Sequence, residues 1–332
     1  MNKVDQQHKE LIKKILTTGH TKNDRTNIGT TSIFGHQMRF KMKDGFPLLT
    51  LRKIHTKSLI HEILWLLGAY DEKFKKFRNT NIRYLLENGC TFWTDWPLKN
   101  YNENNSEKLD QKEFENKILT NDDFALQWGD LGPVYGEQWL NFGGVNQIDY
   151  IIDMLKNNPE DRGIIVSCWN VPKLNHMMLR PCHMMFQFYS YEMNEESRFY
   201  EFSKWKHNYN IPMKDTMEQH NFPTRKLSLQ LYIRSNDCYL GQPFNIAEYA
   251  LLLHMVGQIV NMVPCELIYT IGDAHLYNNS IDASNKLLLR NSYDLPTLIL
   301  NREIKSIYDF RYEGISIENY KSHSNIKVDV AV

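Results

Sequence analysis

The residue best suited to covalent chemistry is Cys182, which follows a proline and precedes His183 in the segment 179–189. The apolar residues 184–190 predict a strand that begins where the cysteine loop ends. A cysteine on a short loop at a strand edge has little conformational freedom, which suits a nucleophile. A lone cysteine is more often a buried structural residue, so this assignment depends on its surroundings.

A second candidate is Glu62, which lies inside the apolar segment 59–67 that ends at Gly68. This segment is apolar on nearly every face, which predicts a buried helix. Burial among leucine, isoleucine and tryptophan raises the pKa of a carboxyl group and suits proton transfer near neutral pH. The alternative is a glutamate at a polar edge beside His61.

Two arginines lie where they could bind an anion: Arg25 in the turn-rich loop 23–30, and Arg234 after the alternating strand 227–233. Taken alone, each would be a solvated surface charge. An arginine fork can, however, hold a phosphate through two parallel hydrogen bonds.

These segments, with 234–237 and 241–245, resemble the thymidylate synthase family, and the resemblance runs through most of the chain. It implies reductive methylation of dUMP to dTMP, with 5,10-methylenetetrahydrofolate as donor of carbon and hydride and without a metal. C5 of uracil is a poor nucleophile, so a thiolate from Cys182 must first add at C6. Positive charge from Arg234 is expected to stabilise that thiolate.

The resemblance also implies a role for each site residue. The expected catalytic residues are Cys182, Glu62, Tyr135, Arg234, Asp237 and Asn245. The residues expected to bind dUMP are Arg25, Arg162, His183, Gln187, Arg234, Ser235, Asn236, Asp237, Asn245, His275 and Tyr277. Those expected to bind the folate are Arg52, His55, Trp93, Leu179, Asp237, Gly241, Phe244, Ala331 and Val332. A pocket of Trp, Leu and Phe with one Asp suits a flat pterin with polar edges, and the apolar C-terminus is expected to fold over it.

Asn245 is expected to read the base, because a side-chain amide offers one donor to O4 and one acceptor to N3–H of uracil. Family members that use deoxycytidylate carry an aspartate at this position. Asparagine therefore indicates dUMP.

Three departures from the family concern the phosphate and its surroundings. The chain reads Arg162-Gly163 where most members carry two arginines that reach the partner subunit's phosphate, so one cross-subunit contact is expected to be missing. Arg180 stands where small or apolar residues are usual, and Thr94 where an acid is common. The resemblance still implies a homodimer, mediated by the sheet, in which Arg162 serves the neighbouring site.

The overall composition agrees with a protein of the reducing cytoplasm. The 332 residues carry 39 basic and 39 acidic side chains, which argues against a dedicated nucleic-acid surface. Five cysteines without ligand spacing favour free thiols over disulfides or zinc. The polar N-terminus is no signal peptide, and no apolar run has membrane-spanning length. We expect a cytoplasmic protein, in the host cytoplasm if the source is a virus, without membrane association.

The apolar patterns predict one α+β domain over residues 1–332, with a twisted mixed sheet flanked by helices. Helices are expected at 4–18, 59–67, 148–155 and 248–262, and strands at 31–34, 164–168, 184–190, 227–233, 268–271 and 306–310. A polar turn is expected at 272–278. Two surface insertions are expected, at 97–127 with one short helix and at 191–226 within a hairpin. The aromatic residues of the second could cover the active site or bury a local patch.

Two other functions remain open. Hydroxymethylation of a pyrimidine nucleotide on the same scaffold would differ only in that water, not hydride, reaches the methylene carbon. Trp93 and the Val-Ala-Val end favour methylation, because both shield the methylene from water in the family. A nucleotide- or RNA-binding regulator without catalysis is opposed by the intact Cys182, Glu62 and Asn245.

Overall fold

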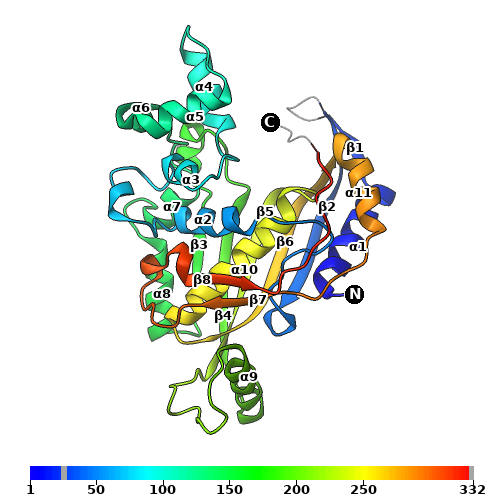
Figure 1. The fold of residues 1–332 in the computed structure, drawn as a ribbon, viewed down its shortest axis with the longest axis vertical. Helices are drawn as coiled ribbons and strands as arrows, with labels where there is room; N and C mark the ends of the chain where they lie inside the picture. Colours follow the sequence, from blue (N-terminus) through cyan, green and yellow to red (C-terminus); the bar gives the residue numbers. More distant parts are fainter. Residues whose placement is uncertain (24–27, 329–332) are drawn as a thin grey trace.

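A mixed β-sheet forms the centre of the molecule in the computed structural model, which describes residues 1–23 and 28–328. Six strands of this described part pair in the order β1-β2-β6-β5-β4-β3 (Figure 1). They are β1 (His20–Lys22), β2 (Thr30–Lys41), β3 (Ile165–Ser167), β4 (His183–Glu192), β5 (Arg225–Asp237) and β6 (Val263–Tyr277). Neighbours run antiparallel except β5 and β6, which are parallel. The predicted α+β class with a mixed sheet is confirmed.

The parallel pair is connected by α10 (Gly241–Ile259), because parallel neighbours need a crossover. The helix is buried along most of its length, which explains its nearly continuous apolar sequence. It begins at Gly241, so the predicted start at 248 is wrong. Pro243 lies in the first turn, where its missing N–H costs no intrahelical hydrogen bond.

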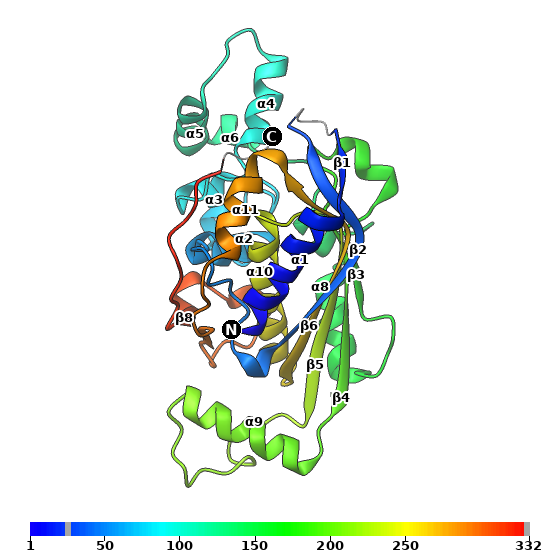
Figure 2. The ribbon, with the colours of Figure 1, turned by 90° about the vertical axis from the view of Figure 1, so that its right-hand side faces the viewer.

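The two faces of the sheet differ in their covering. Helices α1 (Lys3–Thr18), α10 and α11 (Ile281–Leu288) lie on one side (Figures 1 and 2). On the other face, β4 exposes alternate side chains: Met185 is 36% exposed and Tyr189 66%. A strand alternates its side chains, so the buried Phe186 and Phe188 belong to the helix-covered face.

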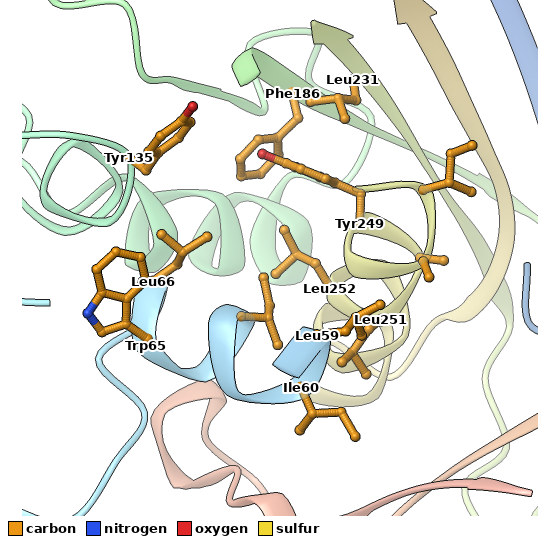
Figure 3. Packing of buried hydrophobic residues seen from close by; sticks show 14 of the residues in the cluster. Leu59, Ile60, Trp65, Leu66, Tyr135, Phe186, Leu231, Tyr249, Leu251 and Leu252 are labelled. Carbon is orange, nitrogen blue, oxygen red and sulfur yellow. The ribbon is translucent and has the colours of Figure 1, made fainter. Parts of the chain in front are cut away.

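Helix α2 (Thr56–Leu66) packs against α10 in the core (Figure 3). Leu59 from α2 and Leu252 from α10 are completely buried there. The helix starts after His55, whose side chain accepts from the Ser58 N–H, and its last turn precedes Gly68 with φ +62°. The predicted buried helix is confirmed.

The region 97–127 contains more structure than the single helix predicted. It holds α4 (Asp95–Asn104), α5 (Gln111–Thr120) and α6 (Asp122–Trp128). The prediction is wrong because two side-chain caps start helices over short apolar stretches: Asp110 forms a capping box with Glu113, and Asn121 caps α6. Rings of Tyr101, Phe114 and Phe124 pack together between these helices.

The region 191–226 extends the β4–β5 hairpin and contains α9 (Glu195–Asn208). Antiparallel pairing of β4 with β5 confirms the predicted interrupted hairpin. The rings of Phe202, Trp205 and Phe222 contact one another, with 5.1 Å between the centroids of Phe202 and Phe222. The aromatic residues of this insertion therefore bury a local patch.

Two further sequence predictions are wrong. Strand β6 continues to Tyr277 where a polar turn was expected, because Asp273 and His275 keep the ladder with both β2 and β5. A short 3₁₀ helix at Ile307–Asp309 replaces the alternation expected at 306–310. Polar residues at the end of β6 account for the first difference. The Ser306 side chain, which caps the short helix, accounts for the second.

The remaining elements complete the layers around the sheet. They are α3 (Arg83–Glu87), α7 (Gly136–Leu140), α8 (Gln147–Asn157), β7 (Thr297–Leu300) and β8 (Ile315–Glu318). Helix α1 matches the predicted helix at 4–18, and α8 matches the one predicted at 148–155. Within residues 1–23 and 28–328, no helix is both long and apolar enough to cross a membrane.

The packed cluster of α4, α5 and α6 gives a stability prediction. Phe114→Ala should lower the free energy of unfolding by about 3–5 kcal/mol, because a buried aromatic ring is replaced by a cavity. Urea unfolding measures the change. Phe199→Ala, at a position that is 63% exposed, is the control and should change it by less than about 0.5 kcal/mol. Equal effects of the two variants would contradict the packing described for Phe114.

Candidate active site

Cys182 lies directly before β4 and is half-buried. Its backbone is held on both sides: the Cys182 N–H donates to the Tyr135 hydroxyl oxygen at 2.9 Å, and its carbonyl accepts from the Arg234 N–H at 2.9 Å. The thiol thus sits on a loop with little freedom, at the start of a strand, as predicted. This placement suits a nucleophile.

Arg234 also holds the cysteine loop with its side chain. The guanidinium donates from Nε to the Pro181 carbonyl at 2.9 Å and from Nη2 to the Arg180 carbonyl at 2.8 Å. It lies over the Trp169 ring, 5.8 Å from the centroid, a cation–π contact. Arg234 belongs to β5 itself, which continues past the predicted end of the strand at 233. The arrangement brings a permanent positive charge next to the cysteine loop.

Tyr135 is held in a backbone conformation that is rare for a side chain other than glycine, with φ +31°. Its ring packs edge-on against Trp93 at 5.8 Å and against His183 at 5.3 Å. Burial raises the pKa of its hydroxyl well above the ordinary value, so it remains protonated. The packing on both sides supports the strained backbone and aims the hydroxyl at the cysteine loop.

Glu62 projects from α2 and is 7% exposed. The Trp93 indole Nε1–H donates to Glu62 Oε1 at 2.7 Å. Burial raises the pKa of this carboxyl to about 8, and the bond from Trp93 opposes that rise only in part. The expectation of a desolvated acid that holds a proton near neutral pH agrees with this geometry.

Asn245 lies in the first turns of α10, beside β5 and β4. Its Oδ1 accepts from Asn236 Nδ2 at 3.4 Å, and Asn236 Oδ1 accepts from the Tyr269 hydroxyl at 2.9 Å. His183 Nδ1 pairs with the Tyr249 hydroxyl at 3.2 Å. Burial lowers the pKa of His183 to about 4, so its ring is neutral. Asn245 therefore lies in a network of amide, hydroxyl and neutral imidazole groups.

The ends of β5 and β6 carry four more predicted residues. Asp237 is paired in register with His275, and Ser235 with Asp273. Asp237 Oδ1 accepts from the N–H groups of residues 239 and 240, at 2.8 and 3.1 Å, in the turn that starts α10. Burial raises the pKa of the Asp237 carboxyl. His275 Nδ1 lies 3.2 Å from Asp273 Oδ1, and its ring packs against Tyr277.

Beside Glu62 lies an aromatic wall, made of the rings of Phe92, Trp93, Trp96 and Phe244. Trp93 contacts Trp96, with ring centroids 5.1 Å apart, and Phe92 contacts Phe244 at 5.8 Å. Trp93 and Phe244, both expected to bind the folate, thus belong to one aromatic cluster. Leu179 and Gly241 lie at the edges of this region, in the cysteine loop and at the start of α10.

Arg52, which is expected to bind the folate, is buried. It is 7% exposed, and its Nη2 donates to the carbonyls of Tyr239 at 2.6 Å and Leu240 at 2.9 Å. Its Nε has no partner among the described residues. His55 is exposed and caps α2. The buried Nε is a donor that a polar edge of the folate could satisfy.

A cavity of about 500 Å³ opens between α4 and the cysteine loop. Its walls include Leu179, Arg180 and Arg234 from the site, with Trp96 and Lys99 from α4. The insertion 97–127 thus contributes directly to this cavity. A separate cavity of about 140 Å³ between α9 and the end of α10 contains none of the predicted site residues.

Some predicted residues do not join this cluster. Gln187 lies on β4 and donates to the Arg162 carbonyl at 2.8 Å. Arg162 is exposed, next to the edge strand β3. Both lie away from Cys182 within this chain, so their expected contacts with dUMP stay predictions. Arg25, Ala331 and Val332 lie outside the described residues.

Sequence reasoning missed several residues that the structure brings to the site, namely Phe92, Trp96, Trp169, Glu248, Tyr249 and Tyr269. Glu248 carries the same signal that pointed to Glu62, an acid inside an apolar helix. The others look like core aromatic residues in the sequence. Among the described residues, no group of three or more His, Cys, Asp or Glu side chains is arranged to hold a metal ion.

Comparison with known proteins agrees with the site. The family model described as "Thymidylate synthase" matches residues 6–332. A protein named "Thymidylate synthase" from Mycoplasma mobile is 43% identical over 330 residues, covering 98% of this chain and 100% of that protein. One of the same name from Malacoplasma penetrans is 41% identical over 329 residues, covering 98% and 99%. Another, from Aster yellows witches'-broom phytoplasma, is 41% identical over 326 residues, covering 97% and 98%. The chain therefore belongs to the thymidylate synthase family.

Proposed function

We propose that this chain makes dTMP by reductive methylation of dUMP, with 5,10-methylenetetrahydrofolate as the second substrate. The observation that carries the proposal is Cys182, fixed between Tyr135 and Arg234 on a loop beside the Asn245 network. Membership of the family supports a methyltransferase. The names of the relatives do not favour hydroxymethylation.

The first chemical step belongs to Cys182. Its sulfur forms a bond to C6 of the uracil ring, and the electrons of the C5–C6 double bond move to O4 as an enolate, which makes C5 nucleophilic. The neighbouring guanidinium of Arg234 favours the thiolate that attacks. The same side chain is proposed to bind the nucleotide phosphate, together with Arg25 and Ser235.

The charge that develops on the base must be neutralised. Glu62, with its pKa raised to about 8, carries a proton near neutral pH and can release it toward the pyrimidine as O4 becomes basic. Asn245 would pair with N3–H and O4, and His275 with Tyr277 would contact the sugar. Tyr135 lies next to the nucleophile and is proposed to face the reacting carbon.

The folate, when bound, supplies the one-carbon unit and the hydride. Trp93 and Phe244 belong to the aromatic wall that would hold its ring and exclude water. Asp237 would meet a polar edge of that ring. Ala331 and Val332 are proposed to cover it.

The exposed face of the sheet supports a homodimer. In addition to Met185 and Tyr189, Tyr191 is 40% exposed and Phe34 83%, so large apolar side chains stand on this face without a covering layer from the described chain. Arg162 lies at its edge, bonded to Gln187 of the same face. Pairing of two copies through this face would carry Arg162 toward the neighbouring site. We propose a cytoplasmic location for the dimer.

Cys182→Ala should abolish turnover while dUMP still binds, because the proposed phosphate and base contacts lie on other residues. Mass spectrometry of the protein incubated with 5-fluorodeoxyuridylate and the folate should show no covalent adduct. Cys265→Ala, which removes another partly accessible thiol, is the control and should keep both turnover and adduct. Turnover at the parent rate in Cys182→Ala would refute the proposed mechanism.

Glu62→Gln should change how stability depends on pH. The folded-state pKa of about 8 exceeds the ordinary 4.5, so between these values the folded protein keeps a proton that the unfolded chain has lost. The free energy of unfolding of the parent therefore falls as pH rises through this window. The variant should lack this pH dependence. Toward pH 8 its free energy of unfolding should therefore rise relative to that of the parent, by an amount on the order of a few kcal/mol.

Urea unfolding near pH 5 and near pH 8 measures this difference. Turnover of Glu62→Gln should also fall by roughly 10²–10⁴, the usual contribution of a general acid or base. A constant stability difference between variant and parent at both pH values would mean that Glu62 titrates normally.

Asn245→Asp should weaken discrimination against deoxycytidylate, because the carboxylate accepts from the exocyclic amine and cannot donate to O4. A buried polar group left unpaired costs about 1–3 kcal/mol, so relative specificity should shift by roughly one to two orders of magnitude. Competition kinetics with both nucleotides measures the shift. An unchanged preference for dUMP would show that Asn245 does not read the base.

A complementation experiment tests the dimer. Arg162→Ala and Cys182→Ala subunits should each be poorly active alone. After subunit exchange, both defects fall in one site of the heterodimer and the other site is intact, so activity should reappear. Subunits that exchange without recovery would show that Arg162 acts within its own chain.

A further inference from the structure

Glu248 is a buried acid for which the proposed mechanism has no use. It lies on α10 and has no solvent exposure. Neither of its carboxylate oxygens has a hydrogen-bond partner among the described residues. An orphaned buried carboxyl group is costly, so its presence requires a physical reason.

The position of Glu248 relates it to two site residues. It follows Asn245 by three positions on the same helix, so the two side chains share a face. Helix α10 packs against α2, and the charge of Glu62 raises the pKa of Glu248 further after burial itself has raised it. Glu248 in turn raises the pKa of the buried Tyr249 and Tyr269 hydroxyls. Its carboxyl oxygens can accept a hydrogen bond.

A directed chain of hydrogen bonds fixes the orientation of the Asn245 amide. The Tyr269 hydroxyl donates to Asn236 Oδ1 at 2.9 Å, so Asn236 must present its Nδ2 to the next group. That Nδ2 donates to Asn245 Oδ1 at 3.4 Å, which leaves Asn245 Nδ2 on the opposite side. There the Asn245 amide interacts with the Glu248 carboxyl as a donor and lowers its pKa, although the pair has not closed to hydrogen-bond geometry. His183 interacts with the same amide from β4.

We propose that Glu248 is a positioning residue that determines which pyrimidine the site accepts. With the Glu248 carboxyl oxygen accepting one N–H of Asn245 and Asn236 donating to one lone pair of its oxygen, a uracil that displaces His183 from the amide would find one N–H for O4 and one lone pair for N3–H. A flipped amide would present N–H toward N3 and oxygen toward position 4, the pattern that cytosine matches. Glu248 thus holds Asn245 in the orientation that reads uracil. This inference rests on the proposed function, because it concerns the base that the same site binds.

The test compares dUMP with deoxycytidylate in binding, measured by isothermal titration calorimetry. Glu248→Leu removes the acceptor at similar volume, and the preference for dUMP should fall roughly tenfold, the value of one hydrogen bond. Glu248→Gln keeps a neutral carbonyl oxygen and should restore the preference. Glu248→Leu should fold with an unchanged or higher melting temperature, because an unpaired buried acid is replaced by an apolar side chain.

His254→Leu is the matched control, because His254 lies on the same helix and its Nε2 is also buried without a partner in the described chain, but it lines the separate cavity near α9. Its preference for dUMP should equal that of the parent. An unchanged preference for dUMP in Glu248→Leu, or an equal loss of affinity for both nucleotides, would overturn the inference while leaving the proposed function intact. A parent protein that binds neither nucleotide would refute the proposed function itself.

Discussion

Arg234 holds the loop of Cys182 through three hydrogen bonds, and most of the proposed site depends on them. Its N–H pairs with the Cys182 carbonyl, and its guanidinium pairs with the carbonyls of Pro181 and Arg180. Because Arg234 belongs to β5, a central strand of the sheet, these bonds tie the cysteine loop to the middle of the sheet. Strand β5 pairs with β4 on one side and with β6 on the other. The register of β5 with β6 places His275 beside Asp237. One strand therefore aligns the cysteine loop with the residues proposed to hold the sugar and the folate.

A second constraint is desolvation. The packing of α2 against α10 buries Glu62 and Glu248, and both carboxyl groups have a raised pKa, while burial lowers the pKa of His183 to about 4. The buried acids and the neutral imidazole surround Asn245. Among them Glu62 has a pKa of about 8, close to neutral pH, which suits proton transfer when charge develops on the base. The cost of burying them is offset by the apolar core that surrounds them.

The sequence predicts most of the fold that is needed to position this site. The alternating strands, the interrupted hairpin and the buried helix around Glu62 follow from periodicity, because burial on one face leaves a direct pattern. The predictions failed where tertiary contacts override a local pattern. Polar residues 272–277 continue β6 because two neighbouring strands pair with them. Tertiary packing also overrides the local pattern in α10. This helix begins at Gly241 and runs through Gln242 and Pro243, both of which are buried.

The sequence predicts the chemistry of the site better than its supporting contacts. Cys182, Glu62 and Arg234 stand out by residue type and surroundings, and the structure brings them to one region. The hydrogen-bond chain from Tyr269 through Asn236 to Asn245 joins β6, β5 and α10, so no local pattern reveals it. Of the aromatic wall, the resemblance singles out Trp93, whereas Phe92 and Trp96 look like ordinary core residues in the sequence.

The most direct test of reductive methylation is the product of the folate in a single assay. With dUMP and 5,10-methylenetetrahydrofolate, the absorbance change of dihydrofolate should rise in step with dTMP, one molecule for each, because the hydride comes from the folate. Formation of 5-hydroxymethyl-deoxyuridylate with tetrahydrofolate, and without dihydrofolate, would contradict the account.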